Sequence, residues 1–366
     1  MKTMVEKLLA VLPAWDMDPD TREAIAKSAR ALLGDEALLE TSKSYYDRMF
    51  APGAAPCHDL TEWSEPAADA VMGENMLFTV VFFVRTMELE QAGTYVYGPD
   101  NTPVDFRGTA LRHMKSFYGR NDCYGVTGQS RKHLYEYLQP SMMQVGRLVY
   151  ELNAFPFEYE VWRSRKTGET LPLMKADLRF DDTDRPHTEG SFVTTRTEAD
   201  GRLTGYTYTE KGLLNRTPVT LDLSEWEPFI VKGDPVVSLH IPGNDKFTPD
   251  VVDTSLVYGR EFLARYFPDF RYKAFICSSW LLGTDLADFV REDSNILNFQ
   301  SRFRIGLSFR NYFSIYDNVF NVPKHCPLEE LVPTNRFQRE ILEMVKGGGT
   351  LYSGRGYILK DETEEY

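Results

Sequence analysis

The sequence has few cysteines and histidines, and they are widely spaced. Among 366 residues there are four cysteines and six histidines, with no Cys-x-x-Cys and no His-x-x-x-His pair. Zinc ribbons, dithiol redox motifs and helical metal sites need such spacings. We therefore expect no metal site and no disulfide framework.

Positive charge is also in deficit. The sequence contains 41 Lys and Arg and 54 Asp and Glu, which gives a formal net charge of -13. Binding to phosphate backbones needs a basic surface, so we expect no nucleic-acid partner.

Long apolar runs are missing as well. The most apolar run, residues 76–84, has about half of the roughly 20 residues that a membrane-spanning helix needs. The first residues lack the apolar core of a signal peptide. We expect no membrane partner and a cytoplasmic location.

The familiar catalytic signatures do not occur. There is no Gly-x-Ser-x-Gly elbow, no His-Glu-x-x-His and no kinase motif set, and no carboxylate pair has a diagnostic spacing. Motifs alone therefore assign no reaction.

The first 140 or so residues have mostly helical spacing. Apolar residues recur every three or four positions, with Asp18 or Asp20 as a helix cap and a long apolar helix expected over residues 67–87. From about residue 145 the pattern changes to short strands and turns, with a strong hairpin signal at Ala199-Asp200-Gly201. We predict a helical domain over residues 1–144 and a sheet domain over residues 145–366.

One strand–loop–helix unit organises the second domain. Residues 235–242 form a nearly continuous apolar strand, as expected of a central strand covered on both faces. After a short loop, Thr248 and Pro249 suit the start of a helix that Pro268 ends. A strand at 272–277 and further helices and strands follow, the last helix being capped by Thr334. The fold class is α+β, with a mixed, largely antiparallel sheet flanked by helices.

Three places could carry chemistry. The loop Gly243–Phe247 precedes a helix whose first N–H groups could hold a pyrophosphate beside Lys246, although loop chemistry alone favours an ordinary βα loop with a capped helix. Ser279 follows a strand in the run Cys277-Ser278-Ser279, where small polar residues often line clefts, but Cys277 suits a buried core position. Asn295 follows Ser294 and either acts in a site or belongs to a helix cap.

Several short sequence segments resemble those of a known family. Val237-Ser238-Leu239-His240-Ile241-Pro242, Ser279-Trp280-Leu281-Leu282 and Asn298-Phe299-Gln300 resemble the bacterial GNAT-like acyltransferase-domain proteins, which have a helical GNAT-like N-terminal domain and a GNAT-like C-terminal domain. The resemblance extends over most of the chain, and the segments most specific to the family lie within residues 236–345.

The resemblance implies an acyltransferase that uses acetyl-CoA or another acyl-CoA. In GNAT-like proteins the pantetheine arm pairs with a central strand where it splays from its neighbour, and the next loop and helix N-terminus hold the pyrophosphate. Carried over by element, this implies cofactor-binding roles for Leu239, Ile241, Gly243, Asn244, Lys246, Phe247 and Thr248. His240 is the candidate general base, because imidazole titrates near neutrality, and Ser279 and Asn295 complete the candidate catalytic set. The acceptor is a small-molecule or peptide amine.

Two departures from the family pattern keep alternatives open. The loop lacks the usual Arg/Gln-x-x-Gly-x-Gly/Ala pattern, and no tyrosine lies between Tyr272 and Tyr312 to act as the usual acid. A non-catalytic binding or structural protein on a GNAT-like scaffold is the main alternative. A hydrolase that uses Cys277 or Ser279 is another. The oligomeric state is not indicated.

Overall fold

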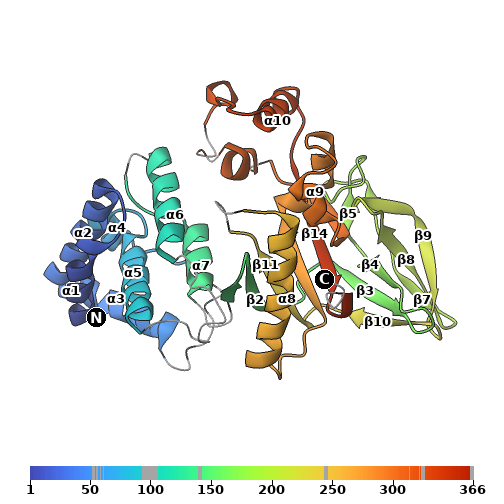
Figure 1. The fold of residues 1–366 in the computed structure, drawn as a ribbon, viewed down its shortest axis with the longest axis horizontal. Coiled ribbons are helices and arrows are strands. Elements are labelled where there is room, and N and C mark those ends of the chain that lie inside the picture. Colours follow the sequence, from blue (N-terminus) through green and yellow to red (C-terminus); the bar gives the residue numbers. More distant parts are fainter. Residues whose placement is uncertain are drawn as a thin grey trace. The chain divides into compact units, whose positions relative to one another are not determined.

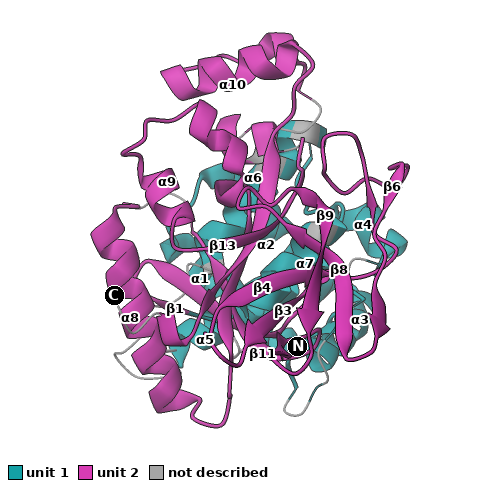
Figure 2. Cartoon of the chain, turned by 90° about the vertical axis from the view of Figure 1, so that its right-hand side faces the viewer, with its two compact units in different colours: residues 1–143 teal, residues 144–366 magenta. Residues whose placement is uncertain are grey.

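The chain forms two compact units, Met1–Met143 and Gln144–Tyr366, which Figure 2 colours separately. The computed structural model describes residues 1–51, 54, 57, 59–60, 62–92, 106–121, 123–138, 142–242, 246–312, 314–320, 322 and 326–362. The candidate residues Gly243 and Asn244 lie outside these ranges.

The first unit is helical, as predicted. Its core surrounds α5, on which every residue from Met76 to Val84 is buried, and α5 packs against α1, α2, α3 and α4. Asp18 caps α2, accepting a hydrogen bond from the Thr21 N–H at 2.8 Å. The helices are α1 (Lys2–Val11), α2 (Pro19–Gly34), α3 (Glu36–Phe50), α4 (Pro66–Met72), α5 (Met76–Gln91), α6 (Phe106–Asn121) and α7 (Gly128–Tyr137).

The prediction of one helix over residues 67–87 is wrong. The chain breaks between α4 and α5, whose axes differ by 80°. Gly73 has φ 106° and Asn75 φ 60°, backbone conformations that a helix cannot continue through. Within the described residues no single helix is long and apolar enough to cross a membrane, and α4 and α5 meet that composition only as this bent pair.

The second unit contains two larger sheets and a small hairpin. The first sheet, called sheet A here, has the strand order β1-β2-β11-β12-β14-β13, and in Figure 1 α8 lies alongside it. Strand β11 lies between β2 and β12, which confirms the predicted central strand, although it ends at His240 and leaves Ile241 just beyond it. The strands are β1 (Met142–Val145), β2 (Leu148–Ala154), β11 (Pro235–His240), β12 (Ala274–Ser279), β13 (Arg304–Arg310) and β14 (Tyr352–Leu359).

The other large sheet, sheet B, is inserted between β2 and β11. Its order is β10-β3-β4-β8-β7, with β9 on β8, and the predicted turn at Ala199–Gly201 joins β7 to β8 with Asp200 and Gly201 at positive φ. The strands are β3 (Tyr159–Ser164), β4 (Thr170–Met174), β7 (Thr197–Ala199), β8 (Arg202–Tyr208), β9 (Leu214–Asp222) and β10 (Trp226–Ile230), and β5 (Arg179–Phe180) pairs with β6 (Phe192–Val193).

An apolar core joins the two sheets. Tyr159 and Val161 of sheet B share one buried cluster with Val236, Ile276 and Tyr357 of sheet A. Side chains alternate between the faces of a strand, so the even-numbered residues of β11 and β12 point toward sheet B. The odd-numbered residues point to the opposite face, where α8 lies.

Helix α8 (Pro249–Tyr266) is held on sheet A by buried hydrogen bonds of Ser255. The Tyr150 hydroxyl donates to the Ser255 carbonyl at 2.5 Å, and the Ser255 hydroxyl accepts from the Leu148 N–H at 3.0 Å. Gly259 permits this approach, because a Cβ there would lie 2.3 Å from the Tyr150 ring. These contacts fix the middle of α8 relative to β2, the strand that pairs with β11.

The remaining helices follow β12 and β13. Segments 284–288 and 315–320 form 3₁₀ and π turns, and the short helix α9 spans Asn295–Gln300. Helix α10 spans Arg336–Lys346, and its cap is Asn335, whose side chain accepts from the Gln338 N–H at 2.9 Å. The expected cap Thr334 is therefore wrong by one residue. Its hydroxyl instead donates to the Gln338 side chain at 2.8 Å.

Candidate functional site

Strands β11 and β12 separate at their carboxyl ends. Against β2, all of Pro235–His240 is in register. Against β12, the parallel ladder contains only the pairs Val237↔Phe275 and Ser238↔Ile276, while β12 itself stays paired with β14 as far as Ser279. Within the described residues, the backbone beyond Ser238 therefore has no ladder partner on the β12 side. An extended ligand can form hydrogen bonds with such an unpaired strand edge.

His240 lies on the face of β11 that points toward sheet B, and it contacts a carboxylate. Its Nε2 is 2.9 Å from Oε2 of Glu151 on β2. The His240 side chain is 31% exposed and that of Glu151 is 19% exposed. An ionised carboxylate can only accept a hydrogen bond, so Nε2 carries the proton and Nδ1 is the basic nitrogen. This is the arrangement of a carboxylate that orients an imidazole base.

A second contact holds Glu151 in place. The Asn153 amide donates to Glu151 Oε2 at 3.4 Å and to the Ser238 hydroxyl at 3.1 Å. Glu151 is opposite Ser238 in the β2–β11 ladder, which makes His240 its diagonal neighbour on the same face. Sequence analysis found His240 but missed Glu151, which lies 89 positions away and comes close only through this register.

Arg147, which the sequence analysis also missed, holds the loop after β11 from both ends. From the β1–β2 turn its Nε donates to the Lys246 carbonyl at 2.7 Å and its Nη2 to the Pro242 carbonyl at 2.8 Å. The guanidinium lies 5.3 Å from the centre of the Phe247 ring. Arg147 is nearly buried, with 8% exposure. Its charge therefore lies beside the two described ends, Pro242 and Lys246, of the loop that the sequence predicts to bind a pyrophosphate.

The start of α8 already has a negative group of its own. Thr248 occupies the N-cap position, but its side chain makes no capping bond to the backbone. Its hydroxyl instead donates a hydrogen bond to the Asp250 carboxylate. This hydrogen bond is the main reason that the pKa of Asp250 is lowered. Lys246 is exposed and the Phe247 ring packs on Phe299 at 5.0 Å. The positive end of the helix dipole thus faces both Lys246 and a carboxylate.

Among the described residues, Ser279 and Asn295 form no hydrogen bond with His240. The Ser279 side chain accepts from the Leu281 N–H at 3.2 Å at the start of a 3₁₀ turn. Asn295 is exposed and begins α9, which Ser294 caps. In the part of the chain that the structure describes, no hydrogen bond links either residue to His240, and a shared catalytic role stays a prediction.

Two further observations bear on chemistry. Cys277 is 2% exposed, and burial raises the pKa of its thiol to about 12, so the thiolate needed by a cysteine hydrolase is disfavoured. Across the described ranges there is no group of three or more His, Cys, Asp and Glu that could hold a metal ion.

Comparison with solved structures finds acyltransferases. An acyltransferase in complex with decanoyl-CoA matches with a TM-score of 0.57 and 18% identity, over 97% of this chain and 86% of that one. An acyltransferase in complex with decanoyl-CoA and teicoplanin matches with a TM-score of 0.53 and 16% identity, over 93% and 86%. Identities this low show a shared fold.

Comparison with curated protein sequences found no match. A sequence model of the GNAT-like C-terminal domain, by contrast, matches residues 142–358. This range is more than half of the chain and contains α8, His240, Glu151 and all of sheet A except Leu359. The chain therefore belongs to the family of proteins that carry a GNAT-like C-terminal domain.

Proposed function

We propose that the protein is an acyltransferase that moves an acyl group from acyl-CoA to an amine. The observation that carries the proposal is the separation of β11 from β12 after Ser238, where the strand backbone has no ladder partner on the β12 side among the described residues. The family match and the acyltransferase fold of the similar structures support it. Those structures contain decanoyl-CoA or octanoyl-CoA.

The pantetheine arm is proposed to lie along Leu239–Ile241. Its amides are suited to pair with a strand backbone, and the Leu239 side chain is buried, so the contact is a backbone one. The thioester then lies between the ends of β11 and β12. Backbone N–H groups that point into this gap would stabilise the charge that develops on the thioester oxygen.

His240 and Glu151 supply the proton chemistry in this proposal. The amine nitrogen attacks the thioester carbon, an N–C bond forms, the C–S bond breaks and CoA leaves as its thiol. His240 Nδ1 takes the proton that the nitrogen loses and can return it to the leaving sulfur. Glu151 holds the ring in the tautomer that this needs.

The acceptor is proposed to be a small molecule or a peptide that carries an amine. Two of the similar structures contain teicoplanin or 10C-teicoplanin, which supports an acceptor of this general kind. The side of sheet A that bears His240 faces away from α8, so acceptor and CoA would approach the gap from opposite faces.

The test is turnover with a set of acyl-CoA lengths. Acetyl-, octanoyl- and decanoyl-CoA are mixed with protein and a panel of primary amines, and released thiol is measured by a chromogenic disulfide. We expect amine-dependent thiol release that His240→Ala reduces by at least about a hundredfold. Release that His240→Ala leaves unchanged would remove His240 from the mechanism.

One observation favours a second candidate function. Asp250 places a carboxylate where a pyrophosphate is expected, as in a GNAT-like scaffold that has lost CoA and binds another molecule. Calorimetric titration with CoA separates the two. Heat of binding with a 1:1 stoichiometry supports the acyltransferase, and no heat at millimolar CoA supports the binding protein.

A further inference from the structure

Unit 2 contains a cavity of about 500 Å³ away from the gap between β11 and β12. Its lining includes Leu307 and Phe309 of β13, Arg355 of β14 and residues of the segment 177–188. None of the candidate CoA-site residues lines it. A volume of this size accommodates a small organic ligand.

The interior of the cavity is apolar and its mouth is polar. Phe180 and Leu307 are 0% and 3% exposed, whereas Asp177, His187 and Thr188 are exposed residues of the lining. A ligand that fits this distribution has an apolar body inside and polar groups at the opening.

Arg355 supplies the positive charge of the interior. Its guanidinium carbon lies 4.8 Å from the centre of the Phe309 ring and 5.6 Å from that of Phe157. Within the described residues no hydrogen bond or ion pair reaches it. The planar fork of a guanidinium matches a planar anion with two acceptor oxygens.

Tyr208 adds a hydroxyl. It is 7% exposed, it lines the cavity, and its Oη has no hydrogen-bond partner among the described residues. A buried hydroxyl without a partner is costly, so its persistence calls for an explanation. Burial also raises the pKa of Tyr208 strongly, so the hydroxyl stays protonated and can donate.

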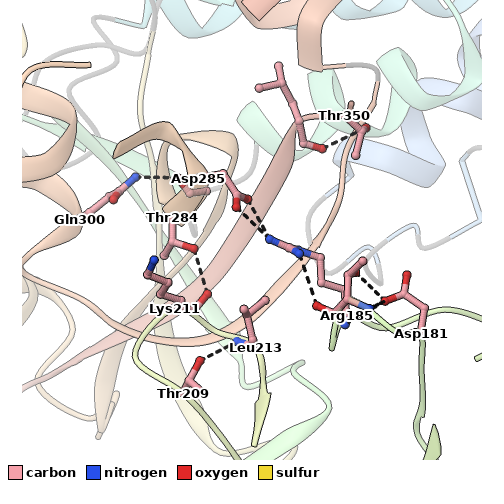
Figure 3. Close-up of polar contacts among 12 residues, drawn as sticks. Asp181, Arg185, Thr209, Lys211, Leu213, Thr284, Asp285, Gln300 and Thr350 are labelled. Carbon is pink, nitrogen blue, oxygen red and sulfur yellow. Dashed lines mark hydrogen bonds and ion pairs between the residues drawn. The ribbon is translucent and has the colours of Figure 1, made fainter. Parts of the chain in front are cut away.

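Hydrogen bonds tie the segment 177–188, which supplies part of the lining, to the rest of unit 2. Figure 3 shows Arg185 between Asp181 and Asp285, its Nη2 donating to both Asp285 carboxylate oxygens at 2.9 and 3.1 Å. Asp181 accepts from the Thr183 N–H at 2.9 Å within the same segment. Because Asp285 follows β12, these hydrogen bonds connect the segment 177–188 to sheet A. The cavity therefore has its shape before a ligand binds.

We propose that this cavity binds a small monocarboxylate with an apolar body, whose two oxygens take hydrogen bonds from Arg355 and Tyr208. Arg179 and the carboxylates of Glu158 and Asp177 also line the cavity, so two cations and two anions nearly balance there and one added negative charge is tolerated better than two. A phosphate ester, with nearly two charges, would face the carboxylate of Glu158, which lines the same cavity and whose pKa is lowered by its bond with Lys175. The proposal does not depend on the acyltransferase function.

The test uses phenylacetate, cinnamate and octanoate as probes, with phenylacetamide as the uncharged control, in calorimetric or NMR titrations of the full chain. At least one carboxylate should bind in a saturable way, and phenylacetamide should bind at least about tenfold more weakly than phenylacetate. Arg355→Met, which keeps the apolar bulk over the rings, should weaken binding by a similar factor.

Tyr208→Phe and Tyr159→Phe form a matched pair. Both remove a buried hydroxyl that has no partner among the described residues, but Tyr159 lies outside the cavity lining. Neither change should lower the melting temperature. We expect Tyr208→Phe to weaken carboxylate binding by about threefold to tenfold and Tyr159→Phe to leave it unchanged. Failure of all three carboxylates to bind, equal binding of the amide, or equal effects of the two variants would overturn the proposal.

Discussion

At the residue scale, the contact between Glu151 and His240 has the clearest functional consequence. Glu151 fixes which imidazole nitrogen is protonated, and its own position depends on Asn153. The two strands that carry them pair over six residues, so the geometry is held by backbone hydrogen bonds and not by a loop. Glu151 is thus a positioning residue for the candidate base.

Glu151→Gln tests this role. The amide keeps the shape of the side chain but can donate as well as accept, so the preferred tautomer of His240 is lost. We expect kcat to fall by about tenfold to a hundredfold, with KM for acyl-CoA nearly unchanged, in steady-state assays at several pH values. Glu151→Asp should recover part of the rate. A rise in KM with unchanged kcat would contradict a role in orienting the base.

Gly259 offers a test of the packing that holds α8. In Gly259→Ala the new Cβ would overlap the buried Tyr150 ring, so unfolding free energy should fall by roughly 1–3 kcal/mol, the usual cost of overpacking. Gly34→Ala at the end of α2 is the control, because nothing lies within 4 Å of its Cβ position. That variant should stay within about 0.5 kcal/mol of the unchanged protein in urea denaturation. Equal losses in the two variants would refute the packing argument.

At the element scale, the N-terminus of α8 combines favourable and unfavourable features for a phosphate. Its N–H groups and Lys246 attract negative charge, whereas Asp250 repels it. If the pyrophosphate of CoA lies there, the two side chains should change affinity in opposite directions.

Asp250→Asn should therefore strengthen CoA binding by about twofold to fivefold at low salt, and Lys246→Glu should weaken it. Glu261→Gln removes the same charge from an exposed position later on α8 and should have little effect. Calorimetry at two salt concentrations measures all three. Weaker binding by Asp250→Asn would show that the pyrophosphate lies elsewhere.

The elements that could be predicted from the sequence are those in which the spacing of apolar residues matches the pattern of buried positions. The apolar run at 235–242 indicated a central strand and β11 is one. Strand β14 was missed, because Tyr352-Ser353-Gly354-Arg355-Gly356 has the glycine content of a turn. Those glycines serve close packing instead, since a Cβ at Gly354 would lie 2.1 Å from the Leu282 carbonyl oxygen. Both the placement of β14 and the position of Arg355 depend on contacts between distant segments, which local patterns do not contain.

At the scale of the whole molecule, each unit has a core of its own. One buried cluster lies entirely within residues 5–138, and the cluster between sheets A and B lies within residues 155–359. The sequence predicted the change from helices to strands near residue 145, because the two halves differ in periodicity. That residues 1–144 are a GNAT-like domain, and that the protein is cytoplasmic, stay predictions.

A fragment of residues 140–366 should therefore fold without the first unit. We expect a cooperative thermal transition by circular dichroism and retained binding of CoA, because β11, β12 and α8 all lie within it. A fragment that melts without cooperativity would show that the second core needs the first.

Hydrogen–deuterium exchange with and without octanoyl-CoA tests the central claim most directly, because it reports on the backbone that is proposed to bind pantetheine. The account predicts that the ligand slows exchange in peptides that contain Leu239–Ile241, while peptides that contain Arg355 exchange as before. Binding of octanoyl-CoA that protects only other segments, with Leu239–Ile241 exchanging at the same rate, would contradict it.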